Sequence, residues 1–93
     1  MFTSNEYFDG KVKSLAFQTA SKPATVGVMA VGDYVFSTAD KEKMTVVSGA
    51  MTIKLAETDQ ECHYQAGESF SVPANSRFDV KISEETAYLC VYG

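Results

Sequence analysis

The chain has 93 residues, of which 45% are hydrophobic and 22% are charged, and its formal net charge is −4. This length fits one domain, residues 1–93, of ordinary globular composition. The acidic balance and the lack of a Lys/Arg-rich run argue against a nucleic-acid polymer as a partner. No apolar run approaches the roughly 20 residues of a membrane span, and MFTSNEYFDG has no signal-peptide pattern. We therefore expect a cytoplasmic protein that does not bind membranes.

Alternation of apolar and polar residues dominates the chain, and no stretch shows a helical period. In chain order, the predicted strands lie within GKVKSLAF (10–17), ATVGVMAV (24–31), YVFST (34–38), MTVVSGAMTIKL (44–55, two runs), ESFSVP (68–73), RFDVKI (77–82) and TAYLCVY (86–92). Short polar loops separate these strands, which recur about every 8–12 residues, and this spacing predicts an all-β sandwich or barrel.

The two cysteines are too few for a disulfide framework. Cys90 lies in the apolar run AYLCVYG and is expected to be a buried thiol, in a reducing compartment. The only histidine, His63, lies in QECHYQAG at the edge of a turn, where a surface or strand-edge position is expected.

Two glycine-bounded stretches carry a resemblance. The first runs from Gly32 through Glu42 to Gly49, with six residues between Glu42 and Gly49, and the second is GESFSVP, from Gly67 to Pro73. Together they resemble the two motifs of the cupin family. The resemblance implies a single-domain cupin-type β-barrel, also called a jelly roll, with Glu42 pointing into its interior.

The histidines of the cupin motifs are missing here. In that family, two His and one Glu of the first motif and one His of the second point inward and hold a metal. Phe36, Thr38 and Phe78 stand near those His positions in this chain. One remaining carboxylate does not make up the three or four ligands of a typical zinc or iron site. We therefore expect no metal cofactor and an aromatic cavity suited to a planar organic ligand.

A closer resemblance covers the chain from Ser4 to Tyr92. The phrases SNEYFDGKVKSLAF, VGVM, GDYVFSTAD, MTVVSGAM, GESFSVP and AYLCVY resemble the small cupins of the pyrimidine/purine nucleoside phosphorylase family. SNEYFDGKVKS is specific to them and is not a general cupin feature. The resemblance implies an enzyme that converts purine or pyrimidine nucleosides and phosphate to free base and α-D-ribose 1-phosphate. Inorganic phosphate would then be a co-substrate, and no cofactor is expected.

Glu42 is the candidate catalytic residue, because a carboxylate accepts hydrogen bonds from ribose hydroxyls and favours a sugar that gains positive charge. Its other interpretation is a solvated charge within the loop DKEK. Thr38 could add a hydroxyl, or could be an ordinary residue at a strand end. For the base, aromatic side chains on the inward strand faces are candidates for stacking, although most such residues in a small barrel are core. These substrate-binding candidates are Tyr34, Phe36, Phe70, Phe78 and Tyr88, with Tyr92 on the same strand face as Tyr88.

The phosphate site has the weakest signal, since the chain lacks a glycine-rich cradle and a helix N-terminus. Arg77 is the only arginine and could clamp phosphate with two hydrogen bonds, although alternation points it outward. Lys11 lies in DGKVKS, near the expected barrel rim. Lys41 and Lys43 flank Glu42. Each of these cations could instead be a solvated surface residue, with loop amides binding the phosphate.

Two other functions remain open. The barrel could bind a sugar or nucleoside as a sensor or carrier without chemistry. It could also be an interaction module whose sheet edges, expected in GKVKSLAF and ATVGVMAV, pair with a partner chain. Because so short a chain buries only a modest core, we also expect a homodimer that shares a sheet edge or face.

Overall fold

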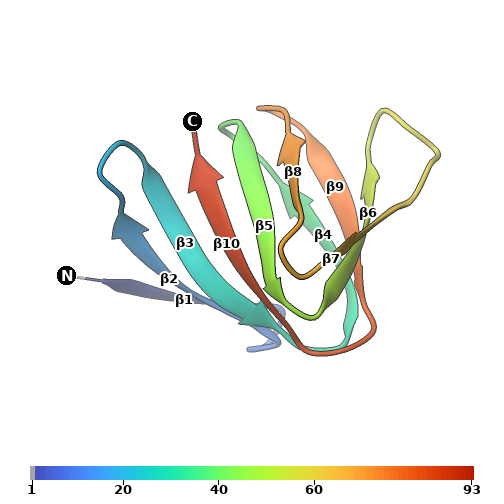
Figure 1. Cartoon of the computed structure of the whole chain (residues 1–93), viewed down its shortest axis with the longest axis horizontal. Coiled ribbons are helices and arrows are strands. Elements are labelled where there is room, and N and C mark those ends of the chain that lie inside the picture. The colour runs from blue at the N-terminus through green and yellow to red at the C-terminus, as the bar shows by residue number, and fades with distance from the viewer. Residues whose placement is uncertain (1) are drawn as a thin grey trace.

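The fold is known from a computed structural model, which describes residues 2–93 and contains ten β-strands and no helix in that range (Figure 1). The strands are β1 (Thr3–Tyr7), β2 (Val12–Gln18), β3 (Pro23–Met29), β4 (Gly32–Ser37), β5 (Glu42–Ser48), β6 (Ala50–Leu55), β7 (Cys62–Gln65), β8 (Ser69–Val72), β9 (Arg77–Ile82) and β10 (Thr86–Tyr92). The prediction of an all-β domain is confirmed. Within the described residues, no helix is long and apolar enough to cross a membrane.

The strands form two antiparallel sheets that face one another (Figure 1). The larger sheet has the order β1-β2-β3-β10-β5-β8, and the smaller has the order β4-β9-β6-β7. Successive side chains of a strand point to opposite faces, so every second residue enters the space between the sheets. On β9 this rule buries Phe78, Val80 and Ile82 and exposes the residues between them. The same alternation places Tyr88 and Cys90 of β10 inside.

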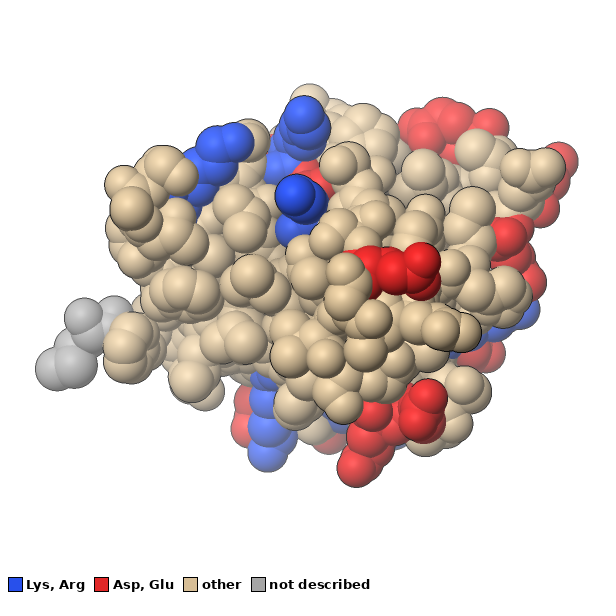
Figure 2. All heavy atoms as spheres, viewed as in Figure 1, with Lys and Arg blue, Asp and Glu red and all other residues tan. Residues whose placement is uncertain are grey.

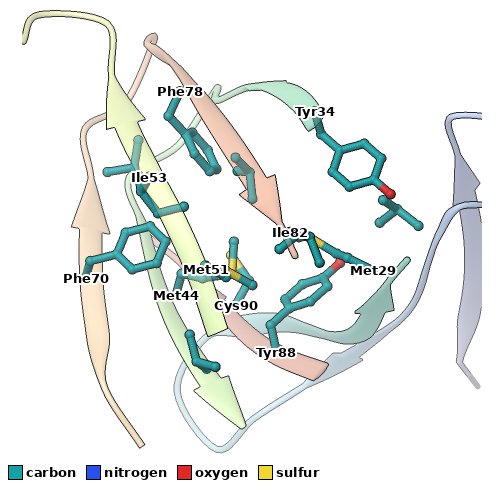
Figure 3. Packing of buried hydrophobic residues seen from close by; sticks show 14 residues of the cluster. Met29, Tyr34, Met44, Met51, Ile53, Phe70, Phe78, Ile82, Tyr88 and Cys90 are labelled. Carbon is teal, nitrogen blue, oxygen red and sulfur yellow. The ribbon is translucent and has the colours of Figure 1, made fainter. Parts of the chain in front are cut away.

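The hydrophobic core fills the closed part of the barrel, as Figure 3 shows. Its side chains come from both sheets and include three methionines, which adapt to irregular gaps. A row of aromatic rings crosses it: Phe36 stacks on Phe78 with centroids 5.6 Å apart, and Phe70 lies 6.4 Å from Phe78. Removal of so central a side chain as Phe78 is expected to cost about 3–5 kcal/mol of unfolding free energy.

Two strands were not predicted from the sequence. β1 and β7 read TSNEY and CHYQ, and neither alternates apolar with polar residues, because neither buries a side chain fully. Both are edge strands. Their presence corrects the expected sheet edges. GKVKSLAF and ATVGVMAV contribute β2 and β3, and these strands lie inside the larger sheet, paired on both sides.

The turn between β1 and β2 closes a seam between the two sheets. Phe8 and Asp9 both adopt left-handed conformations, with φ of 54° and 57°, and Gly10 follows with φ of 82°. Non-glycine residues rarely adopt this conformation, because Cβ then crowds the following carbonyl. The turn thereby places the Phe8 ring 5.0 Å from Tyr34 and 5.5 Å from Phe36, both on the edge strand β4.

Candidate functional site

The interior of the barrel contains one carboxylate. Glu42 begins β5, where its backbone pairs with Tyr92 of β10 on one side and Val72 of β8 on the other. Its side chain is half-buried, and its Oε1 accepts a hydrogen bond of 3.4 Å from the thiol of Cys90. The hydroxyls of Tyr92 and Thr25 lie 3.0 Å apart beside it. Glu42 therefore points into the barrel rather than into solvent, as the cupin motif implied.

Burial is the largest influence on the Glu42 carboxyl and raises its pKa, the Cys90 thiol opposes the rise, and Asp40 adds to it. Burial also raises the pKa of Cys90, and the negative charge of Glu42 adds to the rise, so that this pKa is about 12. The thiol thus stays protonated and serves as a hydrogen-bond donor. A partly desolvated carboxylate interacts more strongly with a developing positive charge than one in bulk water.

Glu42 lines a cavity of about 250 Å³ between the two sheets. The lining residues are Tyr7, Ser14, Thr25, Met29, Phe36, Ser37, Glu42, Met44, Phe78, Tyr88, Cys90 and Tyr92. Figure 3 shows how Met29, Met44, Tyr88 and Cys90 project from the larger sheet toward Phe78 on the smaller one. The volume lies just below the range of about 300–1,000 Å³ for drug-sized ligands. One small ligand held between aromatic and polar walls suits this space.

The structure brings four of the predicted site residues together: Phe36, Phe78 and Tyr88 line the same cavity as Glu42. Tyr34 and Phe70 also point inward, but they belong to the packed core. Tyr34 donates a 2.6 Å hydrogen bond to the Ala30 carbonyl. Phe70 stacks on Tyr64, with ring centroids 4.6 Å apart.

Thr38 lies outside the cavity lining and joins two loops. Its hydroxyl donates to the Pro73 carbonyl at 2.7 Å and accepts from the Ser76 amide at 2.9 Å. Its own amide donates to the Ser76 carbonyl at 2.9 Å. These bonds occupy the hydroxyl, so the structure assigns Thr38 to the loops after β4 and β8 rather than to a ribose.

The two predicted phosphate residues lie at opposite ends of the barrel. Lys11 lines a separate hollow of about 330 Å³ with Gly10 and Thr86, at the end where β10 begins. Arg77 begins β9 and is exposed, and it pairs with Ser37 of the cavity lining. Glu42 and Tyr92 lie at the same end as Arg77 because β5 begins there and β10 ends there. We call this end the mouth; Lys11 does not reach a ligand held by Glu42.

Cys90 and Tyr92 also line the cavity, as the alternation in TAYLCVY predicted by putting them on the face of Tyr88. Other cavity residues were not singled out from the sequence. Ser14 and Thr25 are small polar residues inside apolar runs, and that interruption of the pattern is their only signal. Tyr7 belongs to the unpredicted strand β1.

The cavity's donor set does not fit a metal. It offers one carboxylate, one protonated thiol and several hydroxyls, and Phe36 and Phe78, which the cupin resemblance puts near histidine positions, have no donor atom for a metal. Across residues 2–93, no group of three His, Cys, Asp or Glu side chains lies close enough to hold an ion.

Two facing antiparallel sheets with a ligand-sized cavity between them define a single-domain cupin-type β-barrel. The structure of Fe(II)-HppE shares this fold, with a TM-score of 0.80 over 99% of this chain and 56% of the other. At 13% identity, that likeness shows the fold alone.

The chain belongs to the pyrimidine/purine nucleoside phosphorylase family, whose sequence profile matches residues 2–92. A Psychrobacter arcticus relative named pyrimidine/purine nucleoside phosphorylase 2 is 62% identical over 89 residues, or 96% of this chain and 95% of the relative. A Hahella chejuensis relative named pyrimidine/purine nucleoside phosphorylase is 57% identical over the full length of both chains. A crystal structure from Vibrio parahaemolyticus, of a protein of unknown function, has a TM-score of 0.97 at 43% identity and covers 100% of this chain and 99% of the other.

Proposed function

We propose that this protein is a nucleoside phosphorylase of broad specificity. It converts a purine or pyrimidine nucleoside and inorganic phosphate to free base and α-D-ribose 1-phosphate. Membership of the family and the names of its relatives support the reaction. The observation that carries the proposal is the half-buried Glu42 in a cavity walled by aromatic rings. A bond forms between an oxygen of hydrogen phosphate and C1′, the bond from C1′ to the base nitrogen breaks, and the proton that the phosphate gives up is taken up by that nitrogen, directly or through water.

Glu42 binds the ribose hydroxyls in this proposal. The sugar gains positive charge as the base departs, so the carboxylate binds the transition state more tightly than the substrate. The 3.4 Å hydrogen bond from Cys90 occupies Oε1 and leaves Oε2 for the sugar. The partial burial of Glu42 strengthens this attraction because less water screens it.

Phe36 and Phe78 supply the aromatic surface for the base. Their stacked rings come from neighbouring strands of the smaller sheet, and both line the cavity. Stacking tolerates any base, because every base has a π face, and it is worth about 1–3 kcal/mol per base in nucleic-acid complexes. An aromatic wall therefore suits an enzyme that accepts purines and pyrimidines alike.

Cations at the mouth are the proposed phosphate site. The Lys22 ammonium group donates a 2.7 Å hydrogen bond to the Gly93 carbonyl, and the Gly93 amide donates to the Lys41 carbonyl, also at 2.7 Å. Gly93 follows the cavity residue Tyr92, so these contacts hold the Lys22 ammonium group and the backbone of Lys41 beside the opening. With Arg77, they form what we call the mouth cations. In Figure 2, Lys and Arg gather along the edge where the C-terminus lies, whereas acidic side chains cluster at the β6–β7 loop.

We further propose a homodimer that shares the outer face of the larger sheet. Leu15 and Val26 are cross-strand partners there, and they are 45% and 41% exposed. Val28, on the same face, is 54% exposed. A second copy fits this strip because a two-fold interface pairs the same apolar patch on both subunits. If Leu15→Glu is a monomer at micromolar concentration and the parent is a dimer by light scattering, the proposal stands; a monomeric parent contradicts it.

A cytoplasmic location is supported by Cys62 and Cys90, which are both free thiols although one is exposed. Reduced thiols are typical of a reducing compartment. Phosphate is the only co-substrate proposed, with no metal or organic cofactor. Full turnover after exhaustive chelation is the expected result, and restoration of activity by one divalent ion per chain would contradict it.

The alternative is a sensor or carrier that binds nucleosides without chemistry, and the same cavity would serve both functions. Incubation with uridine, cytidine, inosine and adenosine, with and without phosphate, separates the two. Free base and ribose 1-phosphate, measured by chromatography only when phosphate is present, support the enzyme. Binding of nucleoside without any product supports the carrier.

Glu42→Gln keeps the size of the side chain and removes its charge. Loss of one charge-assisted hydrogen bond of roughly 1.5–3 kcal/mol lowers kcat/KM on the order of tenfold to a hundredfold. The loss should fall on kcat more than on KM, because the contact strengthens in the transition state. A kcat/KM within about twofold of the parent for both uridine and inosine would remove Glu42 from the mechanism.

A further inference from the structure

The polar groups of the cavity lie at two levels along the axis of the barrel. The carboxylate of Glu42 and the hydroxyl of Tyr92 lie near the mouth, where both residues are partly exposed. Deeper in, Ser14 and Tyr88 are each only 5% exposed, and both line the cavity. The pairing of β10 with β5 places Tyr88 four residues from the row of Glu42, which is roughly 13 Å at about 3.3 Å per residue.

Ser14, Gly27 and Tyr88 lie in one row across β2, β3 and β10. The glycine leaves room for the tyrosine: the Tyr88 hydroxyl lies 2.9 Å from the place where a Cβ atom on Gly27 would sit. The Ser14 Cβ lies 2.9 Å from the same point, so the two hydroxyl side chains meet above the glycine. Burial raises the pKa of Tyr88 to about 12, so this hydroxyl keeps its proton.

The stereochemistry of the proposed reaction fixes a direction. Natural nucleosides have the β configuration and the product has the α configuration, so phosphate attacks C1′ from the face opposite the base. Phosphate, C1′ and base must therefore lie in a line. No Lys or Arg is among the residues that line the cavity, and the mouth cations adjoin its outer end. Lys11 and Lys13, at the other end, line a separate hollow.

We propose that the nucleoside enters base first, so that Ser14 and Tyr88 bind the edge of the base that lies opposite the glycosidic bond. This inference rests on the proposed phosphorylase activity and adds an orientation and two specificity-determining residues. A hydroxyl can donate or accept a hydrogen bond, so this pair matches a keto oxygen on one base and an amino group on another. The ribose then lies beside Glu42, and C1′ faces the mouth cations. Phe36 and Phe78, which pair one row in from Ser37 and Arg77 at the mouth, flank the part of the base next to the glycosidic bond.

Matched substrates test the orientation. Inosine and purine riboside differ only at the 6-oxygen and the N1 proton on one edge of the base, whereas inosine and 2′-deoxyinosine differ only at the ribose 2′-hydroxyl. We compare kcat/KM for these three nucleosides in the parent, Tyr88→Phe, Ser14→Ala and Glu42→Gln. Tyr34→Phe is the control, because that hydroxyl bonds the Ala30 carbonyl and lies outside the cavity lining.

In Tyr88→Phe, we expect the preference for inosine over purine riboside to fall by about threefold to tenfold, as for one neutral hydrogen bond. The preference over 2′-deoxyinosine should stay within twofold. In Glu42→Gln, the preference for inosine over 2′-deoxyinosine should fall, whereas the preference for inosine over purine riboside should stay within twofold. Ser14→Ala should follow Tyr88→Phe, and Tyr34→Phe should leave both preferences unchanged.

A shift of the 2′-deoxy preference in Tyr88→Phe, without a shift of the base preference, would overturn the orientation. An equal loss of kcat/KM on all three substrates in Tyr88→Phe would also overturn it, because such a loss indicates a structural role for Tyr88. Dissociation constants of the same nucleosides, measured by calorimetry, separate this inference from the activity. If nothing is turned over but the same selectivity appears in binding, the phosphorylase proposal fails and the orientation stands; absence of both turnover and binding overturns both.

Discussion

The Tyr88 hydroxyl lies across Gly27, and a methyl group on that glycine would come within 2.9 Å of the hydroxyl oxygen. It would also collide with the carbonyl oxygen of Lys13 on the neighbouring strand. The glycine weakens a strand interior, but here it gives the space that a buried tyrosine needs. Tyrosine and glycine thus act as one unit in the wall of the cavity.

Gly27→Ala is therefore expected to destabilise the protein by about 1–3 kcal/mol, as overpacking of a tight site does. Urea unfolding followed by circular dichroism gives the difference. Part of the loss should be recovered in the double variant Gly27→Ala/Tyr88→Phe, because removal of the hydroxyl relieves one of the three close contacts, with the Lys13 carbonyl and the Ser14 Cβ remaining. Strict additivity of the two single changes would show that the tyrosine and the glycine are not coupled.

The stability of the protein should depend on pH through Glu42. Its pKa is raised in the folded state, so the folded protein binds the proton more tightly than the unfolded chain does. Stability contributed in this way is present at low pH and is lost as the pH rises from the ordinary Glu value through the raised one. Glu42→Gln removes this loss, so its stability relative to the parent should rise between about pH 4 and pH 7.

Glu61 supplies a control of opposite sign. Its 2.8 Å ion pair with Lys81 lowers its pKa. That stabilisation is present at neutral pH and is lost as the pH falls through the lowered pKa. Glu61→Gln should therefore be less stable than the parent at neutral pH and approach it in acid. Melting curves of both variants and the parent from pH 3 to pH 8 test these two pH dependences. If the stability of both variants relative to the parent changes in the same direction with pH, the raised pKa assigned to Glu42 is contradicted.

The two thiols should react at very different rates. Cys62 is exposed on β7, whereas Cys90 is buried and burial raises its pKa to about 12. Since the thiolate is the nucleophile, iodoacetamide at pH 8 should label Cys62 alone in the folded protein, and both cysteines in 6 M guanidinium. Peptide mass spectrometry identifies the labelled residue. Rapid native labelling of Cys90 would mean that the cavity wall opens more often than its packing indicates.

Thr38 should matter for stability rather than for catalysis. Thr38→Ala leaves the Ser76 amide and the Pro73 carbonyl without their partner, at a cost of about 1–3 kcal/mol. Thr38→Ser keeps the hydroxyl and should lose less than half of that amount. Denaturation midpoints and kcat/KM for uridine are measured together. A large fall in kcat/KM in Thr38→Ala at full stability would return this residue to the ribose site.

The strands with one buried face were predictable, because alternation of apolar and polar residues identifies them directly. RFDVKI became β9 with the expected inward face, and TAYLCVY became β10. β1 and β7 were missed because neither buries a side chain fully, whereas the edge strands β4 and β8 do and were predicted. β1 and β7 pair through backbone hydrogen bonds, which the side-chain pattern does not record.

The site was only partly predictable for a similar reason. The inward direction of Glu42 came from the spacing of a motif, and Phe36 and Phe78 came from their strand faces. What alternation cannot tell is how deep an inward residue lies, so Tyr34 and Phe70 were indistinguishable from the true lining. The Ser14–Tyr88 pair depends on strand register across β2, β3 and β10, and register is a property of the pairing rather than of any one segment.

If the mouth cations bind phosphate as we propose, their exposed position has a consequence for the release of the product. Ribose 1-phosphate carries the same phosphate group as the co-substrate and would leave through the same opening. Exposed lysines bind anions weakly because water and salt screen them, so the product escapes as readily as phosphate enters. A cavity that buried its cations would capture phosphate at low concentration and then be slowed by its own product. The open rim instead suits an enzyme that works where phosphate is plentiful and turns over without a closing lid.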